Sequence, residues 1–191
     1  YNALVIDAVI TFNIQRSVTE MLSGLAFFRR ASYTVGGQVV SCDDIEHGIL
    51  RANRGHPLIP GPQFTSVDPR CAWIVSPMDV RIHFALNCAS QSCPPISVYD
   101  AQQIDTQLDV AARNFVASEV IVEISPCQIE LSRIFQWYQD DFGGQAGVVD
   151  FILRYLPDDE SRAKLRDASQ TPKANVKVAY RKYDWSINGV V

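Results

Sequence analysis

Two histidines and two cysteines give this chain the residue types for nucleophilic chemistry. His83, Cys88 and Cys93 all fall in the short stretch RIHFALNCASQSCPP, which runs from Arg81 to Pro95. A cysteine attacks as its thiolate, and an imidazole close by is the usual means of forming that thiolate near neutral pH. The stretch therefore predicts a reactive sulfur.

This stretch is predicted to begin as a buried strand, Val80 to Asn87, and to end in a polar loop. Alternate residues of a strand share a face, so His83 and Asn87 would lie together on the face opposite the core. A nucleophile in the loop could then fold back toward His83. In that arrangement His83 accepts the thiol proton, and Asn87 fixes the tautomer of the ring.

Cys93 is the preferred nucleophile, and Cys88 is the second choice. Cys88 continues the parity of the core face, whereas Cys93 stands in the loop just before two prolines that restrict the backbone. Because those prolines lack an amide hydrogen, the oxyanion of an adduct would have to be bound by the amides of Cys93, Ser92 or a remote loop.

His47 is the alternative base. It stands on a helix predicted over residues 41–51, which begins at a serine cap. Isoleucines mark the buried stripe of this helix, and His47 is predicted to face solvent, away from that stripe. If its face lines a cleft, Glu46 or Asp43 would orient the imidazole. The third histidine, His56, is predicted to be exposed.

The same residue types allow two other kinds of site. A zinc ion could be held by His47, His83, Cys88 and Cys93, although the local spacing of common zinc sites is absent. Cys88 and Cys93 could instead form a small disulfide in an oxidising compartment. The five cysteines are an odd number, which leaves at least one thiol free within a single chain and is compatible with a reducing compartment. Cys42, beside two aspartates, is expected to have a raised pKa and to react poorly. No cofactor is predicted.

The elements that must position these residues are a mixture of helices and hairpins. Helices are predicted over residues 1–12, 17–28, 41–51, 100–118, 132–141, 148–156 and 158–167, strands over 32–35, 38–40, 80–87, 120–124, 128–131 and 176–180, and a proline-rich loop over 54–72. Helices and strands do not alternate regularly. The predicted fold class is therefore α+β, with helices packed on a small, mainly antiparallel sheet, as in papain- or transglutaminase-like enzymes.

Composition sets the outer bounds of the prediction. The chain has 191 residues, of which 47% are hydrophobic and 20% charged, and this suits a single globular domain over residues 1–191. The net charge of −4 and the lack of Lys/Arg runs argue against nucleic acid and anionic membranes as partners. No apolar run is long enough to span a bilayer. Because the chain opens on Tyr1 without a Met, its extreme N-terminal segment is expected to be missing, and a targeting segment could have preceded it.

Several motifs resemble domain-of-unknown-function family 547 in its bacterial-type form. They are, in order, YNA at residues 1–3, DIEHGILR at 44–51, DVRIHFALNC at 79–88, SCPP at 92–95, LSRIFQWY at 131–138, DFG at 141–143 and YDW at 183–185. The resemblance spans nearly the whole chain, and it implies that Glu46, His47, His83, Cys88 and Cys93 are the positions to watch. It also implies export to the periplasm, as in many bacterial members, and it assigns no activity.

These observations predict a cysteine-dependent hydrolase or acyltransferase that acts on a peptide or on a small acyl or amide substrate. Cys93 or Cys88 would be the nucleophile, His83 or His47 the base, and Asn87 or Glu46 the residue that orients the base. The alternative is a catalytically silent structural or interaction domain with protein partners. A metal-binding domain is the third reading, and the compartment is left open.

Overall fold

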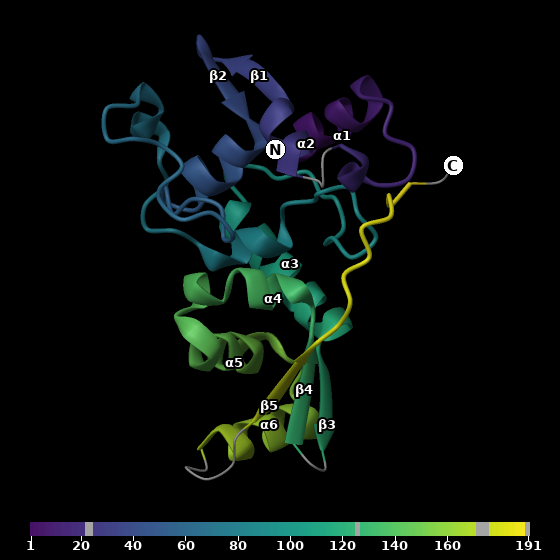
Figure 1. The fold of residues 1–191 in the computed structure, drawn as a ribbon. Helices are drawn as coiled ribbons and strands as arrows, with labels where there is room; N and C mark the ends of the chain where they lie inside the picture. Colours follow the sequence, from purple (N-terminus) through teal and green to yellow (C-terminus); the bar gives the residue numbers. More distant parts are fainter. Residues whose placement is uncertain (22–24, 125–126, 171–175, 190–191) are drawn as a thin grey trace. The chain divides into compact units, whose positions relative to one another are not determined.

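A computed structural model gives the fold of the chain, and it describes residues 1–21, 25–124, 127–170 and 176–189 (Figure 1). The chain divides into two compact units. The first, unit 1, comprises Tyr1–Ser97 together with Asp184–Val191, and the second, unit 2, comprises Val98–Tyr183. Each unit is described by itself. The single domain expected over residues 1–191 stays a prediction.

Unit 1 consists of short helices around one β-hairpin. Its elements are α1 (Asn2–Thr11), the 3-10 helix η1 (Val18–Glu20), α2 (Leu25–Arg30), β1 (Ser32–Val35), β2 (Gln38–Ser41), the π-helix η2 (Asp44–Leu50) and the 3-10 helices η3 (Pro69–Trp73) and η4 (Val80–Phe84). The proline-rich stretch predicted as a loop contains no strand and only the start of η3 among its residues.

The hairpin and the helix that follows it form where the sequence predicts them. Gly36 and Gly37 both adopt positive φ, of 55° and 80°, which a two-residue turn between twisted antiparallel strands requires. Ser41 and Asp44 then cap the start of η2 reciprocally: the Asp44 amide donates to Ser41 Oγ, and the Ser41 amide donates to an Asp44 carboxylate oxygen, each at 3.0 Å.

The helix predicted over residues 17–28 is wrong as one element. Its capping box is present: the Ser17 side chain accepts a backbone amide of η1, and the Glu20 side chain accepts the backbone amide of Ser17. The helix ends after a single turn, however, since Met21 has an extended backbone, and α2 begins only at Leu25. Val18 and Phe27 are both buried in the same apolar cluster, and a chain that bends between them buries both side chains.

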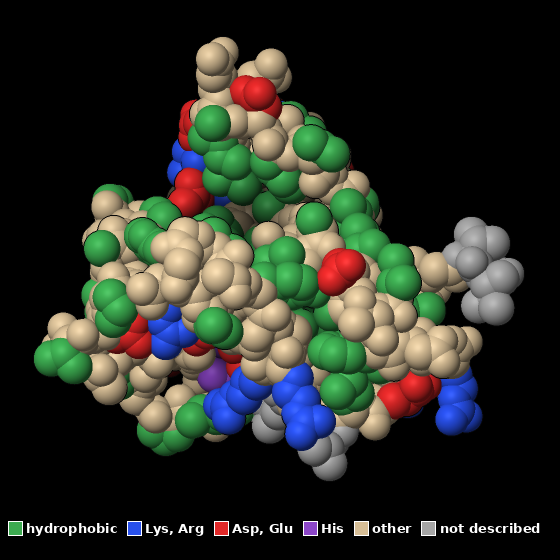
Figure 2. All heavy atoms as spheres, turned by 90° about the horizontal axis from the view of Figure 1, so that it is seen from above, with side chains coloured by type: hydrophobic (Ala, Val, Ile, Leu, Met, Phe, Trp, Pro, Cys, Tyr) green, Lys and Arg blue, Asp and Glu red, His purple; other side chains and the backbone are tan. Residues whose placement is uncertain are grey.

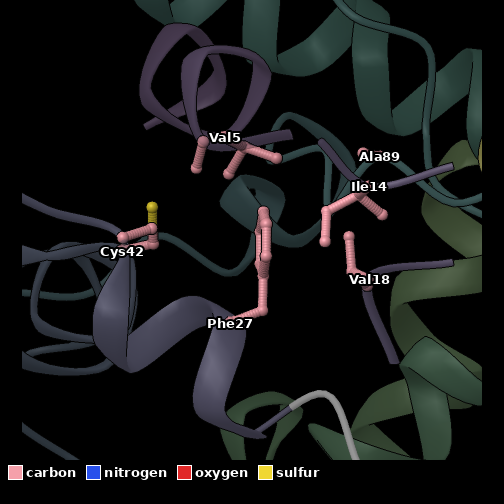
Figure 3. Close-up of a cluster of buried hydrophobic side chains, with 8 residues drawn as sticks. Val5, Ile14, Val18, Phe27, Cys42 and Ala89 are labelled. Atoms are coloured by element: carbon pink, nitrogen blue, oxygen red, sulfur yellow. The ribbon is translucent and has the colours of Figure 1, made fainter. Parts of the chain in front are cut away.

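That apolar cluster is the core of unit 1. Its buried members come from α1, η1, α2 and the segments that connect the elements of unit 1 (Figure 3): Val5, Ala8, Ile14, Val18, Phe27, Ala31, Cys42 and Ala89. Residues from both ends of the chain cover it, among them Tyr1 and Leu4 from the N-terminal side and Trp185 and Ile187 from the C-terminal side. The core therefore joins segments that lie far apart in the sequence.

Unit 2 combines helices with a three-stranded sheet. Its elements are α3 (Ile104–Glu119), β3 (Ile121–Ile124), β4 (Cys127–Leu131), α4 (Arg133–Trp137), the 3-10 helix η5 (Gln139–Phe142), α5 (Gly144–Tyr155), α6 (Glu160–Gln170) and β5 (Lys177–Tyr180). Strands β3 and β4 pair antiparallel, as predicted, while β5 pairs parallel to β4 after a crossover that contains α4, η5, α5 and α6. Helix α6 packs against β3 and β4.

An aromatic cluster stabilises the helical part of unit 2. Phe135 of α4 packs against Phe142 and Phe151, with ring centroids 5.6 Å and 6.4 Å away, and Phe151 packs on Tyr155 at 4.7 Å. These residues match the apolar faces predicted for the helices around residues 132–156. Both units thus contain helices beside small sheets, and the protein has the predicted α+β fold.

A glycine in η2 generates a stability prediction. A Cβ at Gly48 would lie 2.3 Å from the ring of Phe64, which is fully buried. We expect Gly48→Ala to lower the free energy of unfolding by roughly 1–3 kcal/mol, because the buried ring has to move. Denaturant unfolding measures this loss.

The Phe64→Leu background provides the control, because a shorter side chain makes room for the added methyl group. The cost of Gly48→Ala should shrink there, and a double-mutant cycle measures the difference. Equal costs in the two backgrounds would contradict the steric explanation.

Candidate functional site

Glu46 and His47 lie inside unit 1, on η2, and both are buried. His47 is only 3% exposed, so the prediction that it faces solvent is wrong. The reason is the geometry of the helix: backbone bonds such as Arg51 N–H to Glu46 C=O, 2.9 Å, span five residues. A π-helix turns more slowly than the α-helix on which the faces were assigned, and His47 therefore lies on a different face.

The hydrogen bonds of His47 define its tautomer. The guanidinium of Arg51, itself buried, lies with Nη1 3.1 Å from His47 Nδ1. Because a guanidinium only donates, Nδ1 must accept, and the ring proton is on Nε2. That proton points toward Asp43, whose Oδ1 is 3.9 Å from Nε2, while a Glu46 oxygen lies 3.8 Å from Nδ1. The carboxylates predicted to orient His47 are thus both beside it.

Burial and charge set the pKa values of this group in opposite directions. Burial lowers the pKa of His47 to about 4; Arg51 adds to this effect, and Glu46 opposes it. Burial raises the pKa of Asp43 to about 6, with the charge of Glu46 adding to the increase and Arg29, 3.3 Å away, opposing it. At neutral pH His47 is therefore a neutral imidazole.

The other two histidines belong to the same neighbourhood. His56 is half-buried rather than exposed as predicted, and its ring packs edge-on against His47 with centroids 4.9 Å apart. His83 is buried, and its charge is among the influences that lower the pKa of His47. The structure thus brings His47 and His56 into ring contact, and His83 is buried in the same unit. Sequence reasoning missed the contact of His56 with His47, because it expected His56 to be exposed, whereas the i, i+4 spacing of His47 and Arg51 already indicated that those two are neighbours.

The strand predicted over residues 80–87 is wrong. Val80–Phe84 is a 3-10 helix, η4, whose start is capped by Asp79: its carboxylate accepts the Arg81 amide at 2.9 Å and pairs with the Arg81 guanidinium at 2.6 Å. Four consecutive residues, 82–85, are buried, so the segment does not alternate between a core face and a solvent face. The expectation that His83 and Asn87 share a strand face fails with it.

Cys88 and Cys93 are joined by a disulfide bond. It closes a tight turn, here called the disulfide turn, over residues 87–94. The sulfur of Cys93 accepts the amide of Cys88 at 2.9 Å, and the hydroxyl of Ser90 lies 3.4 Å from it. Both cysteines are half-buried. The sequence left a nucleophile, a metal ligand and a small disulfide as alternatives for this pair, and the structure contains the disulfide. A thiolate at either residue therefore requires reduction of that bond.

Asn87 organises this turn. Its side-chain amide donates to the Pro94 carbonyl at 2.6 Å, and its side-chain oxygen accepts the Ala89 amide at 2.6 Å. Its own backbone amide donates to Asn2 Oδ1 at 2.9 Å. These bonds clamp the two ends of the turn together. Its side chain thus bonds to backbone groups of the turn, and no bond among the described residues links it to a histidine in the predicted orienting role.

The backbone amides expected to bind an oxyanion are also engaged. The Cys93 amide donates to the Ser90 carbonyl at 3.1 Å, and the Ser92 amide donates to the Asp184 carbonyl at 3.3 Å. Both amides therefore already have a backbone acceptor. The Cys88 amide donates to the Cys93 sulfur instead.

Cys42 and Cys71 are free thiols. Cys42 is fully buried, and burial together with Asp43 and Glu46 raises the pKa of its thiol to about 12, so the prediction of a poor nucleophile is confirmed. Cys71 is half-buried and donates to the Thr65 carbonyl. Among the residues that the structure describes, no three His, Cys, Asp or Glu side chains are grouped so as to hold a metal ion.

A cleft of about 780 Å³ opens on another part of unit 1. Its walls are the hairpin β1–β2, the start of η2 and the loops around residues 56–63 and 68–70. The lining includes Arg29, Asp44, His56 and Arg70 but no residue of the disulfide turn. Arg70 pairs with Asp44 at 2.9 Å and with Asp68 at 2.7 Å, so much of the cleft's charge is neutralised internally.

The buried His47 generates a prediction on pH dependence. The pKa of His47 is about 4 in the folded protein and ~6.5 in the unfolded protein. Its neutral form therefore stabilises the fold fully above the unfolded pKa, and this stabilisation is lost as the pH falls through the folded pKa. Between pH 7 and pH 4.5 the wild-type protein should therefore lose roughly 2–3 kcal/mol more stability than His47→Gln. Chemical denaturation of both proteins at the two pH values measures this difference.

Asp43 acts in the opposite direction, because its raised folded pKa stabilises the fold at low pH and this contribution fades as the pH rises through about 6. Asp43→Asn should accordingly steepen the acid loss of stability. Parallel pH profiles for wild type and His47→Gln would refute the burial of a neutral imidazole.

Comparison with known proteins identifies a family for this chain. No helix among the described residues has the length and apolarity needed to cross a membrane. No match was found among curated proteins or among solved structures. A family model described as "Protein of unknown function, DUF547" matches residues 1–116, which include η2, η4 and the disulfide turn. The chain therefore belongs to domain-of-unknown-function family 547, as its motifs indicate.

Proposed function

We propose that this domain catalyses acyl transfer or hydrolysis through the thiolate of Cys93, formed when the disulfide is reduced. One observation carries the proposal: the sulfur of Cys93 lies in an ordered, half-buried turn with the Cys88 N–H at 2.9 Å and the Ser90 hydroxyl at 3.4 Å. Hydrogen bonds to a charged form favour that form, so both donors favour the thiolate of Cys93.

The reaction follows from this placement. The thiolate forms a bond to the carbonyl carbon of an acyl or amide substrate, and the carbonyl π electrons move to oxygen. The carbonyl then re-forms as the leaving amine or alcohol departs with a proton from the base, and water or another acceptor releases the acyl group and returns the thiol. The Cys88 amide is the proposed donor to the oxyanion, since its N–H already points toward the sulfur that would carry the adduct.

His83 is the proposed base, in preference to His47. A base with a pKa of about 4 takes a proton from a thiol poorly, and His47 is held in its neutral form by burial and by Arg51. His47 and Glu46 are proposed instead as positioning residues, which hold η2 against the neighbouring histidines. Peptides and small acyl or amide compounds are the proposed substrates.

A second candidate, a domain that binds a partner without catalysis, is favoured by the cleft. The cleft is polar, and its charged lining residues include the paired Arg70, Asp44 and Asp68. In the view of Figure 2, hydrophobic side chains are interspersed with polar atoms. An uncharged partner that forms hydrogen bonds, such as an extended peptide, would suit such a cleft better than a strongly anionic one.

Assays on the reduced protein test the catalytic proposal. Activity toward a panel of thioesters, activated esters and peptide amides should fall about 100-fold or more in Cys93→Ser, since the hydroxyl lacks the reactivity of a thiolate. Cys88→Ser keeps both the Cys93 thiol and the backbone amide beside it, so it should remain active without a reductant. Cys71→Ser is the matched control for a thiol outside the site and should change nothing.

Two further variants distinguish the role of His83 as the base from that of Ser90 as a hydrogen-bond donor to the thiolate. His83→Ala should reduce kcat, whereas Ser90→Ala should shift the acidic limb of the pH profile of kcat/KM upward, because one donor to the thiolate is removed. If no substrate of the panel is turned over, or if Cys93→Ser is as active as the wild type, the catalytic proposal fails and the binding domain is preferred.

A further inference from the structure

The C-terminal segment of unit 1 is bound to the disulfide turn. We call the segment Asp184–Asn188 the C-terminal strap. The Asp184 amide donates to Ser92 Oγ at 2.9 Å, and the Asn188 amide donates to the Ala89 carbonyl at 2.9 Å. In the other direction, the Gln91 amide donates to the Ser186 carbonyl at 2.8 Å.

The strap also reaches the N-terminal part of unit 1. Ile187 donates its amide to the Arg16 carbonyl at 2.8 Å, and Ser186 forms an antiparallel bridge with Ser17. In Figure 1 the strap, drawn in yellow, accordingly lies next to the purple N-terminal loop. Trp185 and Ile187 pack against the core cluster, so the strap covers part of the core as well as forming hydrogen bonds.

The residues that hold the strap are the ones that the disulfide encloses. The bond between Cys88 and Cys93 closes a ring around residues 89–92, and three of these four, Ala89, Gln91 and Ser92, form the hydrogen bonds given above. The ring also holds Ala89 at a φ of +65°, a conformation that residues other than glycine rarely adopt. A crosslink that keeps these residues in place therefore also keeps the strap's partners in place.

We propose that the Cys88–Cys93 pair is a thiol–disulfide exchange site, and that its reduction by an external thiol releases the C-terminal strap from unit 1. This inference goes beyond acyl transfer, because strap release needs no substrate carbonyl. An external thiolate attacks one sulfur and forms a mixed disulfide, while the S–S bond breaks and the other cysteine leaves as a thiolate. A second external thiolate resolves the mixed disulfide, so that two external thiols become one disulfide and the protein gains two thiols.

The hydrogen bonds distinguish the two sulfurs. The Ser90 hydroxyl lies near both, at 3.2 Å from Cys88 Sγ and 3.4 Å from Cys93 Sγ, but the Cys88 amide donates to Cys93 alone among the described bonds. The better-stabilised thiolate is the better leaving group. Attack is therefore assigned to Cys88, with Cys93 as the leaving thiolate.

Hydrogen exchange on the full chain tests the release of the strap. The amides of Asp184, Ile187 and Asn188 should exchange at least about 10-fold faster after reduction with a phosphine, because their hydrogen bonds open. The double variant Cys88→Ser/Cys93→Ser should exchange at the fast rate without reductant. The Arg181 amide, bonded to the Leu131 carbonyl in unit 2, is the internal control and should be unaffected.

Equal strap exchange in the oxidised and reduced wild type would overturn the proposal. Should the double variant fail to fold, which the loss of protection at Arg181 would reveal, the comparison of oxidised and reduced wild type still decides the question. Neither comparison depends on catalytic activity, so strap release and acyl transfer can fail separately.

The assignment of the attacked sulfur has its own experiment. Oxidised protein is treated with glutathione, quenched with iodoacetamide and analysed by peptide mass spectrometry. We expect glutathione on Cys88 and the carbamidomethyl group on Cys93 in the trapped intermediate. Glutathione on Cys93 would reverse the assignment, and a pair that glutathione leaves fully oxidised would show that it is not an exchange site.

Discussion

The bond between the sulfurs of Cys88 and Cys93 constrains more of unit 1 than its position in a surface turn suggests. It encloses residues that bind the C-terminal strap, and Asn87 clamps the same turn through Pro94 and Ala89. It also determines whether Cys93 can form a thiolate, since a disulfide sulfur is not one. The two proposals therefore meet at this turn: the oxidised form would hold the strap, and the reduced form would supply the nucleophile.

The buried charges of η2 show a second constraint. Burying Asp43, Glu46, His47 and Arg51 together would be costly if each stood alone, because a buried charge needs a partner. Arg51 donates to His47 and to the Gly55 carbonyl, and Asp43 pairs with Arg29. The network holds the imidazole neutral and fixes its tautomer. This arrangement suits a positioning role better than that of a strong base, and it leads to the preference for His83.

Much of the fold could be predicted from local signals, and the site only in part. The hairpin at residues 32–41 follows from Gly36-Gly37, and the helix after it from the reciprocal cap of Ser41 and Asp44, because both signals act over a few residues.

The segment at residues 80–87 was predicted wrongly because its apolar residues fit a strand pattern, whereas the Asp79 cap and burial on all sides favour a 3-10 turn. The face of His47 was missed because η2 is a π-helix, and no periodicity rule for α-helices reveals that. For Cys88 and Cys93, the sequence allowed either a disulfide or a nucleophile. It contained no local signal that the C-terminal strap forms hydrogen bonds with the turn between them.

The account's central claim is that reduction gives Cys93 an unusually acidic thiol. The most direct measurement is the ultraviolet absorbance of the thiolate as a function of pH in the reduced protein, with Cys93→Ser subtracted to isolate the Cys93 signal. We predict a midpoint clearly below the ordinary value of about 8.5 for a free cysteine. A midpoint at or above that value would contradict the account, because the donors around the sulfur would then not favour its charged form.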